Sequence, residues 1–437
     1  MTNLFKKFLK YTSLNILGMM GVSCYVLADT FFIAKAFGPE GIVGLNLTIP
    51  IYCLMSAIGL MIGIGGSTKF NILKSLDKNK EAYHMFSSCA KVGLLISLLF
   101  TITGIFFGNP LTNFLGANED TFRLTNIYLK TILIFAPGFI LNNIFTVFSR
   151  NDGFPRLSMT AMLLGSFINI ILDYIFIFVF NMGMFGAAFA TGLSAVISVA
   201  IITFSYILNK RKVFLLREKI LKIHILDSSR LGFPTFIVEI SAAILTAAFN
   251  FIILNIRGNL GVAAYGIVTN ISFIIFSIFN GLSQGIQPLI GEGYGRGNYR
   301  DVNKVFKYGF FSAVFLAFII YFSIFINARN LAGIFTEEGN VEVLNLSMEG
   351  MKIYFFGYFF SGINMVIVMY LSATEKIRKA FVISISRGIL LSLPLVVILG
   401  ETLGMTGIWL SFVLTEFIVL ILAIFLIKSD YNKIILP

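Results

Sequence analysis

Two acidic side chains lie inside long apolar stretches of this chain, where a charge needs a physical reason. Asp29 falls in the run 11–37, and Asp173 falls in the run 157–180. If these runs cross a membrane, each carboxylate costs roughly 3 kcal/mol on insertion scales, and such residues usually mark an ion or proton path. Asn169 precedes Asp173 by one helical turn, so the two side chains share a helix face. The pattern predicts a buried polar site that binds ions.

The composition indicates that these runs do cross a membrane. Hydrophobic residues make up 57% of the 437 residues, charged residues only 12%, and the mean hydropathy is +0.90. Soluble domains carry about 25% charged residues, so the chain is predicted to be an all-α polytopic membrane protein. The longest polar connection, 209–230, is too short for a catalytic domain, and we expect no enzyme activity.

Twelve apolar stretches are long enough to span a bilayer. They lie at 11–37, 44–68, 86–108, 127–148, 157–180, 184–208, 232–256, 262–285, 305–326, 349–371, 380–400 and 404–427. About 27 of the 33 Lys and Arg residues fall at the termini and in every second loop, and the remaining loops hold the acidic cluster Glu337, Glu338 and Glu342. This distribution predicts that both termini are cytoplasmic, and it argues against nucleic acid as a partner of the +12 net charge.

The remaining reactive side chains carry no recognisable chemistry. The cysteines Cys24, Cys53 and Cys89 form no CxxC pair and are read as packing residues. His84 and His224 are interpreted as solvated loop residues, so we expect no zinc or haem site.

The chain also repeats itself, with a nearly constant offset between matching segments. The segment 38–41 recurs at 258–261, Gly59 and Gly63 recur as Gly281 and Gly285, and 182–186 recurs at 403–407. Six predicted helices precede each equivalent point, so both halves start on the same side of the membrane. We therefore expect two six-helix bundles related by pseudo-two-fold symmetry, 1–208 and 232–437, joined by a basic cytoplasmic linker at 209–231.

Helix depth predicts which side chains meet. Asp29, Asp173 and Thr191 each lie seven or eight residues from the same membrane face, about 10–12 Å deep at 1.5 Å per residue. With Asn169 one turn deeper, two carboxylates, an amide and a hydroxyl share one level. Such oxygens suit a proton or a hard cation such as Na⁺, and two facing carboxylates share protons. The alternative is that one or both carboxylates only hydrogen-bond a neighbouring helix.

The repeat assigns this oxygen set to the N-terminal half. At the offset of the repeat the second half carries Asn250, Leu390, Pro394 and Phe412 where the first carries Asp29, Asn169, Asp173 and Thr191. Two other intramembrane acids, Glu239 and Glu416, either bind a cationic substrate or neutralise a base such as Arg387. Together with Asn250 and Asn364 they are the candidates for a substrate or secondary charge site.

With these residues in hand, the chain resembles the multidrug and toxic compound extrusion (MATE) family along essentially its whole length. The segments that carry the resemblance are 150–155 (Arg-Asn-Asp-Gly-Phe-Pro), 169–173 (Asn-Ile-Ile-Leu-Asp), 182–191 and 287–291 (Gln-Pro-Leu-Ile-Gly). The glycine-rich turn after them departs from the family, with Gly293 and Arg296 where Asn and Ala are frequent.

The resemblance implies an exporter of organic cations and amphipathic drugs in a bacterial inner membrane, driven by inward H⁺ or Na⁺ and working as a monomer by alternating access. It implies a cation site at Asp29, Asn169, Asp173 and Thr191, with no cofactor beyond the coupling ion. Glu239 matches an acidic position of one family branch, but that branch also has an aspartate where Asn364 stands. The alternative function is a flippase for lipid or lipid-linked saccharide on a related scaffold, which usually has fourteen helices.

Overall fold

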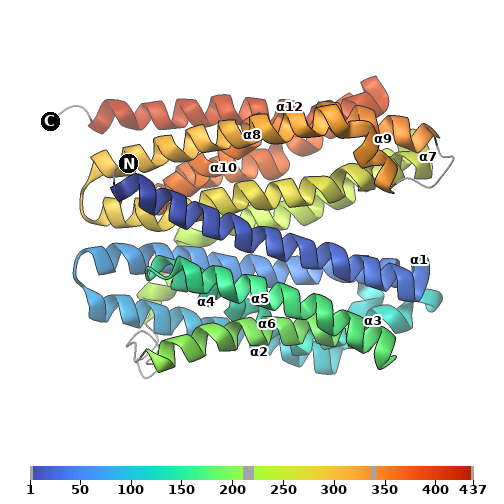
Figure 1. Cartoon of the computed structure of the whole chain (residues 1–437), viewed down its shortest axis with the longest axis horizontal. Helices are drawn as coiled ribbons and strands as arrows, with labels where there is room; N and C mark the ends of the chain where they lie inside the picture. Colours follow the sequence, from blue (N-terminus) through green and yellow to red (C-terminus); the bar gives the residue numbers. More distant parts are fainter. Residues whose placement is uncertain (1–2, 210–220, 336–340, 435–437) are drawn as a thin grey trace.

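The computed structural model describes residues 3–209, 221–335 and 341–434, and these residues form long helices joined by short turns (Figure 1). The acidic residues Glu337 and Glu338 and residues 210–220 of the predicted linker lie outside the described residues. The first half consists of α1 (Asn3–Ser75), α2 (Asn79–Phe114), α3 (Glu119–Ile134), α4 (Ala136–Asn151), α5 (Pro155–Tyr174), the π-helical turn η1 (Ile175–Val179) and α6 (Gly183–Leu208). The second half consists of α7 (Lys222–Gly295), α8 (Tyr299–Phe335), α9 (Val341–Tyr354), the 3₁₀ turn η3 (Phe355–Gly357), α10 (Tyr358–Ala373), α11 (Ile377–Ile385), the π-helical turn η4 (Ser386–Leu390) and α12 (Ser392–Ile434).

The all-α membrane fold is confirmed, but several predicted spans are not separate helices. In the described part of the chain, eight helices are long and apolar enough to cross a membrane, or nine if α3 and α4, which meet at a 50° bend, form one span. The number is below twelve because α1, α7 and α12 each run through a glycine with non-helical backbone, at Gly38, Gly258 and Gly404. Each of these three elements contains two of the predicted stretches or parts of them, so a twelve-helix bundle still results.

The backbone repeats where the sequence does. Residues with positive φ occur in four pairs that share the nearly constant offset of the repeat: Gly38 and Gly258, Asp77 and Gly297, Gly153 and Glu375, Gly183 and Gly404. Gly38 (φ 60°) and Gly258 (φ 64°) turn the chain in the same left-handed conformation, which glycine adopts without steric cost. The two halves therefore reverse direction at corresponding points, as pseudo-two-fold symmetry requires.

The two halves meet along α1 and α7, which share the most extensive contact in the molecule. α1 runs between the halves in Figure 1. Its first turns pack on the second half, where Phe5 meets the ring of Tyr308 on α8 at 5.1 Å. α7 packs reciprocally, because its start contacts α2 through Ser88 and His224, whose Oγ and Nδ1 lie 3.3 Å apart. His224 is thus a buried helical residue, and its interpretation as a solvated loop residue was wrong.

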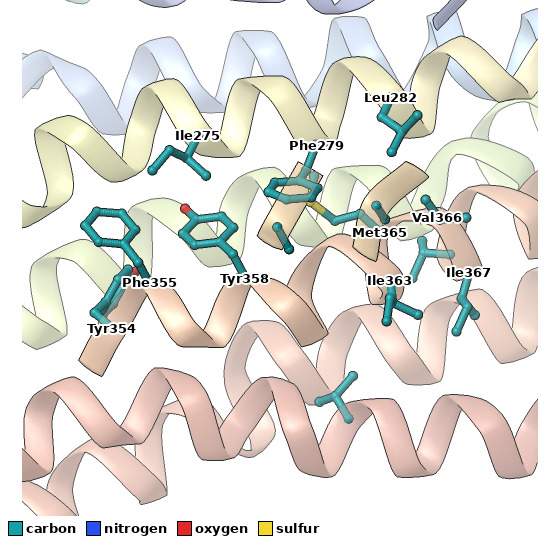
Figure 2. Close-up of a cluster of buried hydrophobic side chains, with 14 of the residues drawn as sticks. Ile275, Phe279, Leu282, Tyr354, Phe355, Tyr358, Ile363, Met365, Val366 and Ile367 are labelled. Atoms are coloured by element: carbon teal, nitrogen blue, oxygen red, sulfur yellow. The ribbon is translucent and has the colours of Figure 1, made fainter. Parts of the chain in front are cut away.

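Aromatic side chains fill the core of the second half. Figure 2 shows Tyr354, Phe355 and Tyr358 facing α7. The ring of Tyr358 stacks on Phe279 at 5.6 Å, and its hydroxyl donates to the carbonyl of Ser272 at 3.0 Å. This pairing satisfies a buried phenol, so the ring can pack inside an apolar bundle.

Glycines allow α1 and α7 to approach closely. A methyl group on Gly65 of α1 would overlap the carbonyl of Ser228 and the backbone of Gly232 on α7, and one on Gly232 would overlap the carbonyl of Met61. We expect Gly65→Ala to destabilise the protein by about 1–3 kcal/mol, because overpacked contacts force the backbone apart. The measurement is the thermal midpoint of the detergent-solubilised protein.

Gly333→Ala on α8 is the matched control, since no atom of the described residues lies close enough to crowd a methyl group there. It should leave the midpoint unchanged or raise it, because alanine favours the helix by up to about 1 kcal/mol. Equal effects of the two substitutions would contradict the close approach.

Candidate functional site

Asp29 and Asp173 come together inside the first half. Asp29 lies on α1 and is 6% exposed, and Asp173 lies on the last turn of α5 and is fully buried. α1 and α5 pack against each other, and the rings of Phe32 and Tyr174 lie 6.3 Å apart, which brings Asp29 and Asp173 to the same part of the first half. Both oxygens of Asp173 and Oδ1 of Asp29 are buried without a hydrogen-bond partner among the described residues. Buried carboxylates in this state are costly unless a proton or a cation neutralises them.

Asn169 and Thr191 complete the predicted set. Asn169 Nδ2 donates to Thr191 Oγ1 at 3.4 Å, and Thr191 in turn donates to the carbonyl of Ala187 at 3.1 Å. Asn169 Oδ1 is buried and has no partner among the described residues. The four residues come from α1, α5 and α6, which contact one another. Unpaired carboxylate and amide oxygens in one buried cluster fit a proton or a hard cation such as Na⁺.

Tyr128 belongs to the same cluster, and the sequence reasoning missed it. Its hydroxyl donates to Asp29 Oδ2 at 3.4 Å. The predicted span began at residue 127, which would leave Tyr128 at the membrane surface, whereas α3 begins at Glu119, two turns earlier. The missed signal was a capping box, in which Asn118 accepts from the backbone N–H of Thr121 at 2.9 Å. Asn followed by acidic residues is a typical helix start.

A cavity of about 260 Å³ lies between the halves, and we call it the central cavity. Its walls come from both halves, with Tyr25, Asn142 and Asn143 from the first and Glu239 and Gln284 from the second. A second cavity of about 370 Å³ lies mainly in the second half, beside rings of α7, α9, α10 and α12, and Cys53 of α1 also lines it. Glu239 lines both cavities. Its carboxylate has no hydrogen-bond or ion-pair partner among the described residues, so it is free to meet a cationic ligand in either cavity.

The other three candidates are placed differently. Glu416 forms an ion pair with Arg387, whose Nη2 lies 2.6 Å from Oε1, and Asn364 Nδ2 donates to its Oε2 at 2.7 Å. Both carboxylate oxygens of Glu416 are therefore satisfied within the protein, and of the two roles considered for this residue the geometry favours neutralisation of Arg387. Asn250 is exposed on α7 and lines neither of these two cavities.

The fold and the site together define a class of protein: an internally repeated helical membrane protein with buried acids beside a central cavity. The chain belongs to the MatE family, whose model matches residues 15–175 and 234–398. The match covers corresponding parts of the two halves, in agreement with the internal repeat.

Relatives and solved structures agree with this assignment. The chain is 26% identical over 434 residues to "Multidrug export protein MepA" of Staphylococcus saprophyticus, covering 98% of this chain and 94% of that protein. It is 26% identical over 422 residues to the protein of the same name from Staphylococcus aureus strain MRSA252, covering 94% and 91%.

Among solved structures, one described as MATE in complex with MaL6 has a TM-score of 0.94 at 21% identity, covering 99% of this chain and 97% of that one. A MATE family transporter in an outward-facing conformation has a TM-score of 0.90 at 21% identity, with the same coverage. These likenesses establish the fold.

Removing one hydroxyl tests the role of Tyr128. We expect Tyr128→Phe to lower transport of a fluorescent organic cation about fivefold, because losing a hydrogen bond to a carboxylate costs roughly 1 kcal/mol or more. The measurement is the initial efflux rate from cells that express equal amounts of protein. Tyr299→Phe, at a side chain that is 51% exposed, is the control and should match the native chain. A native rate for Tyr128→Phe would remove Tyr128 from the site.

Proposed function

We propose that this chain is a cation-coupled exporter of organic cations and amphipathic drugs in a bacterial plasma membrane. In this proposal H⁺ or Na⁺ enters at Asp29, Asn169, Asp173 and Thr191, and the drug leaves in exchange. The observation that carries the proposal is the buried carboxylate pair of the first half, because it has no basic partner among the described residues and needs a neutralising ion. The names of the relatives, multidrug export proteins, support the class of substrate.

The cavities suit amphipathic cations. The carboxylate of Glu239 offers a negative charge, and aromatic walls offer apolar area and ring faces that attract cations. The second cavity places the stacked rings of Tyr354 and Phe412, 4.2 Å apart, on its wall. Flat, hydrophobic molecules with one positive charge match both features.

Alternating access requires that one end of the molecule closes while the other opens. Call the end at which α1 begins and α12 ends the proximal end. Near the proximal end, a set of polar contacts joins the first half of the chain to the second half. They are Arg150 with Gln284 at 3.0 Å, Asn15 with the carbonyl of Gly281 at 2.8 Å, Asn71 with the carbonyl of Pro288 at 2.6 Å, Gln287 with Thr68 at 2.8 Å, and Lys69 with Glu375 at 2.9 Å. We call this set the proximal lock.

The proximal lock supports a direction for the cycle. Arg150 is 1% exposed, so its charge is held by amide oxygens of Asn15 and Gln284 rather than by water. With the proximal end closed, the central cavity faces the other side. The Lys and Arg distribution predicts a cytoplasmic proximal end, and with that orientation this state would release drug outward and load the coupling ion. Ion binding must then favour one of the two states for coupling to occur.

Neutral replacement of the carboxylates tests the coupling. We expect Asp29→Asn and Asp173→Asn each to abolish ethidium efflux, because an amide cannot take up a proton or compensate the charge of Na⁺. Transport into vesicles under a pH gradient alone, and then a sodium gradient alone, identifies the ion. Asp120→Asn at the exposed start of α3 is the control and should transport normally. Well-expressed site variants with normal rates would refute the coupling role.

The same vesicles distinguish drug export from the alternative function, a lipid flippase. A flippase would move labelled lipid between leaflets without needing Asp29 or Asp173. Lipid movement with no ethidium transport would therefore favour that alternative over drug export.

A charge exchange tests the proximal lock. Lys69→Glu places two acids together and should change the transport rate by up to about fivefold, since an exposed ion pair is worth up to about 1 kcal/mol. Both partners are about one-third exposed, with side-chain values of 29% and 32%. The double variant Lys69→Glu/Glu375→Lys restores opposite charges and should recover the native rate.

Labelling of a cysteine at the lock reports its opening directly. Ser67 lies at the lock, where its hydroxyl accepts from Gln287 at 3.2 Å. On a chain without its three native cysteines, Ser67→Cys should react faster with a thiol reagent in the Lys69→Glu variant than in the charge-exchanged one. Equal labelling in the two variants would mean that the pair does not hold the halves together.

A further inference from the structure

A buried ion pair in the second half has no part in the cation site described above. Arg387 Nη2 and Nε donate to Glu416 Oε1 at 2.6 and 3.2 Å, and Nη2 also donates to Ser361 Oγ at 2.9 Å. Asn364 donates to Glu416 Oε2 at 2.7 Å and to its backbone carbonyl at 2.9 Å. The side chains of Arg387 and Glu416 are 9% and 4% exposed. Residues from η4, α10 and α12 thus enclose one guanidinium.

Stability alone does not explain this pair. The cost of removing two charges from water often exceeds their attraction, so apolar residues of similar size would hold the helices as well or better. The guanidinium also stands in an unusual place, on the π-helical turn η4, and such turns frequently occur at functional sites. Arg387 and Glu416 both line the 370 Å³ cavity of the second half.

The internal repeat shows how the residues around Arg387 differ from their counterparts in the first half. At the offset of the repeat, Asn364, Arg387 and Glu416 correspond to Asn143, Ser166 and Ala195 of the first half, and those three line the central cavity. The two clusters therefore occupy equivalent places in the two halves. The first-half counterpart carries no charge, whereas the second half brings a carboxylate and its own cation.

The oxygen atoms around the guanidinium are those of a cation site. Oε1 of Glu416 and Oγ of Ser361 accept directly from the guanidinium. Oε2 of Glu416 accepts from Asn364, whose own Oδ1 is buried without a partner among the described residues. Carboxylate, hydroxyl and amide oxygens are ligands of hard cations. A cavity of 370 Å³ leaves room for water and an ion beside them if the guanidinium is removed.

We propose that Arg387 is a tethered cation, which occupies a monovalent-cation site formed by Glu416, Ser361 and Asn364. This site then takes no ion from solution, and in the proposed function the coupling ion binds at the first-half site. Only this consequence for stoichiometry rests on the function proposed above. Replacing the guanidinium by an uncharged side chain should open the site to Na⁺.

The chain carries its own reporter for the test. Trp409 is its only tryptophan, is fully buried on α12, and lies two turns from Glu416, about 10 Å at 1.5 Å per residue. The measurement is Trp409 fluorescence and the thermal midpoint of purified protein during titration with NaCl against choline chloride. All variants carry Asp29→Asn and Asp173→Asn, which silences the first-half site and makes the result independent of the proposed coupling.

In this background we expect Arg387→Met to gain a saturable Na⁺ response in both signals. The parent background and Arg387→Lys, which keep a cation at this position, should give none. Arg387→Met/Glu416→Gln removes both charges and should show no Na⁺ response. This double variant also shows whether the protein folds without the ion pair.

Two results would overturn the proposal. One is an Arg387→Met protein whose fluorescence and midpoint do not change with Na⁺. The other is an Arg387→Met protein that cannot be isolated in NaCl although Arg387→Met/Glu416→Gln can be, because the freed carboxylate would then have no usable cation site.

Discussion

The cost of burying a carboxylate among apolar helices is the constraint on which this structure depends. Each buried acid needs a positive partner, and the protein meets the need in different ways. Asp152 at the proximal end is paired with Lys74 and accepts from Tyr206 at 3.0 Å. Glu416 in the second half is paired with Arg387. Asp29 and Asp173 have no basic partner among the described residues, and in the proposed function an ion from solution takes that place.

Two similar scaffolds thus carry different charge arrangements. Glycine turns at Gly38 and Gly258 and at Gly183 and Gly404 give both halves the same path. Packing is shared as well, because the start of each half lies on the other half. The side chains beside the cavities differ between the halves. In the proposed function the shared scaffold lets the two halves move against each other, and the different side chains restrict binding of the coupling ion to the first half. Under the two proposals, the first half binds the coupling ion and the second half fills its own cation site with Arg387.

Much of the fold was predictable because its signals are local. Apolar length predicts spanning helices, and a nearly constant offset between matching glycine-rich segments predicts the repeat. Helix ends were less predictable, since α1 continues through Gly38 and α3 begins at Glu119, before the apolar run. The second error hid Tyr128. The domain limits 1–208 and 232–437 and the roles of the site residues stay predictions.

The sequence by itself determined the membrane class, the repeat and four oxygen-bearing residues at one depth, because hydropathy and helical rise act along a single chain. Only the tertiary structure decided which polar atoms find partners. Arg150 donates to Gln284 from the other half of the chain, and Arg387 pairs with Glu416. Asp173 has no partner among the described residues. The reason is physical: a buried charge is stabilised by groups within a few ångströms, and the packing of helices, which residue order does not reveal, decides which groups those are.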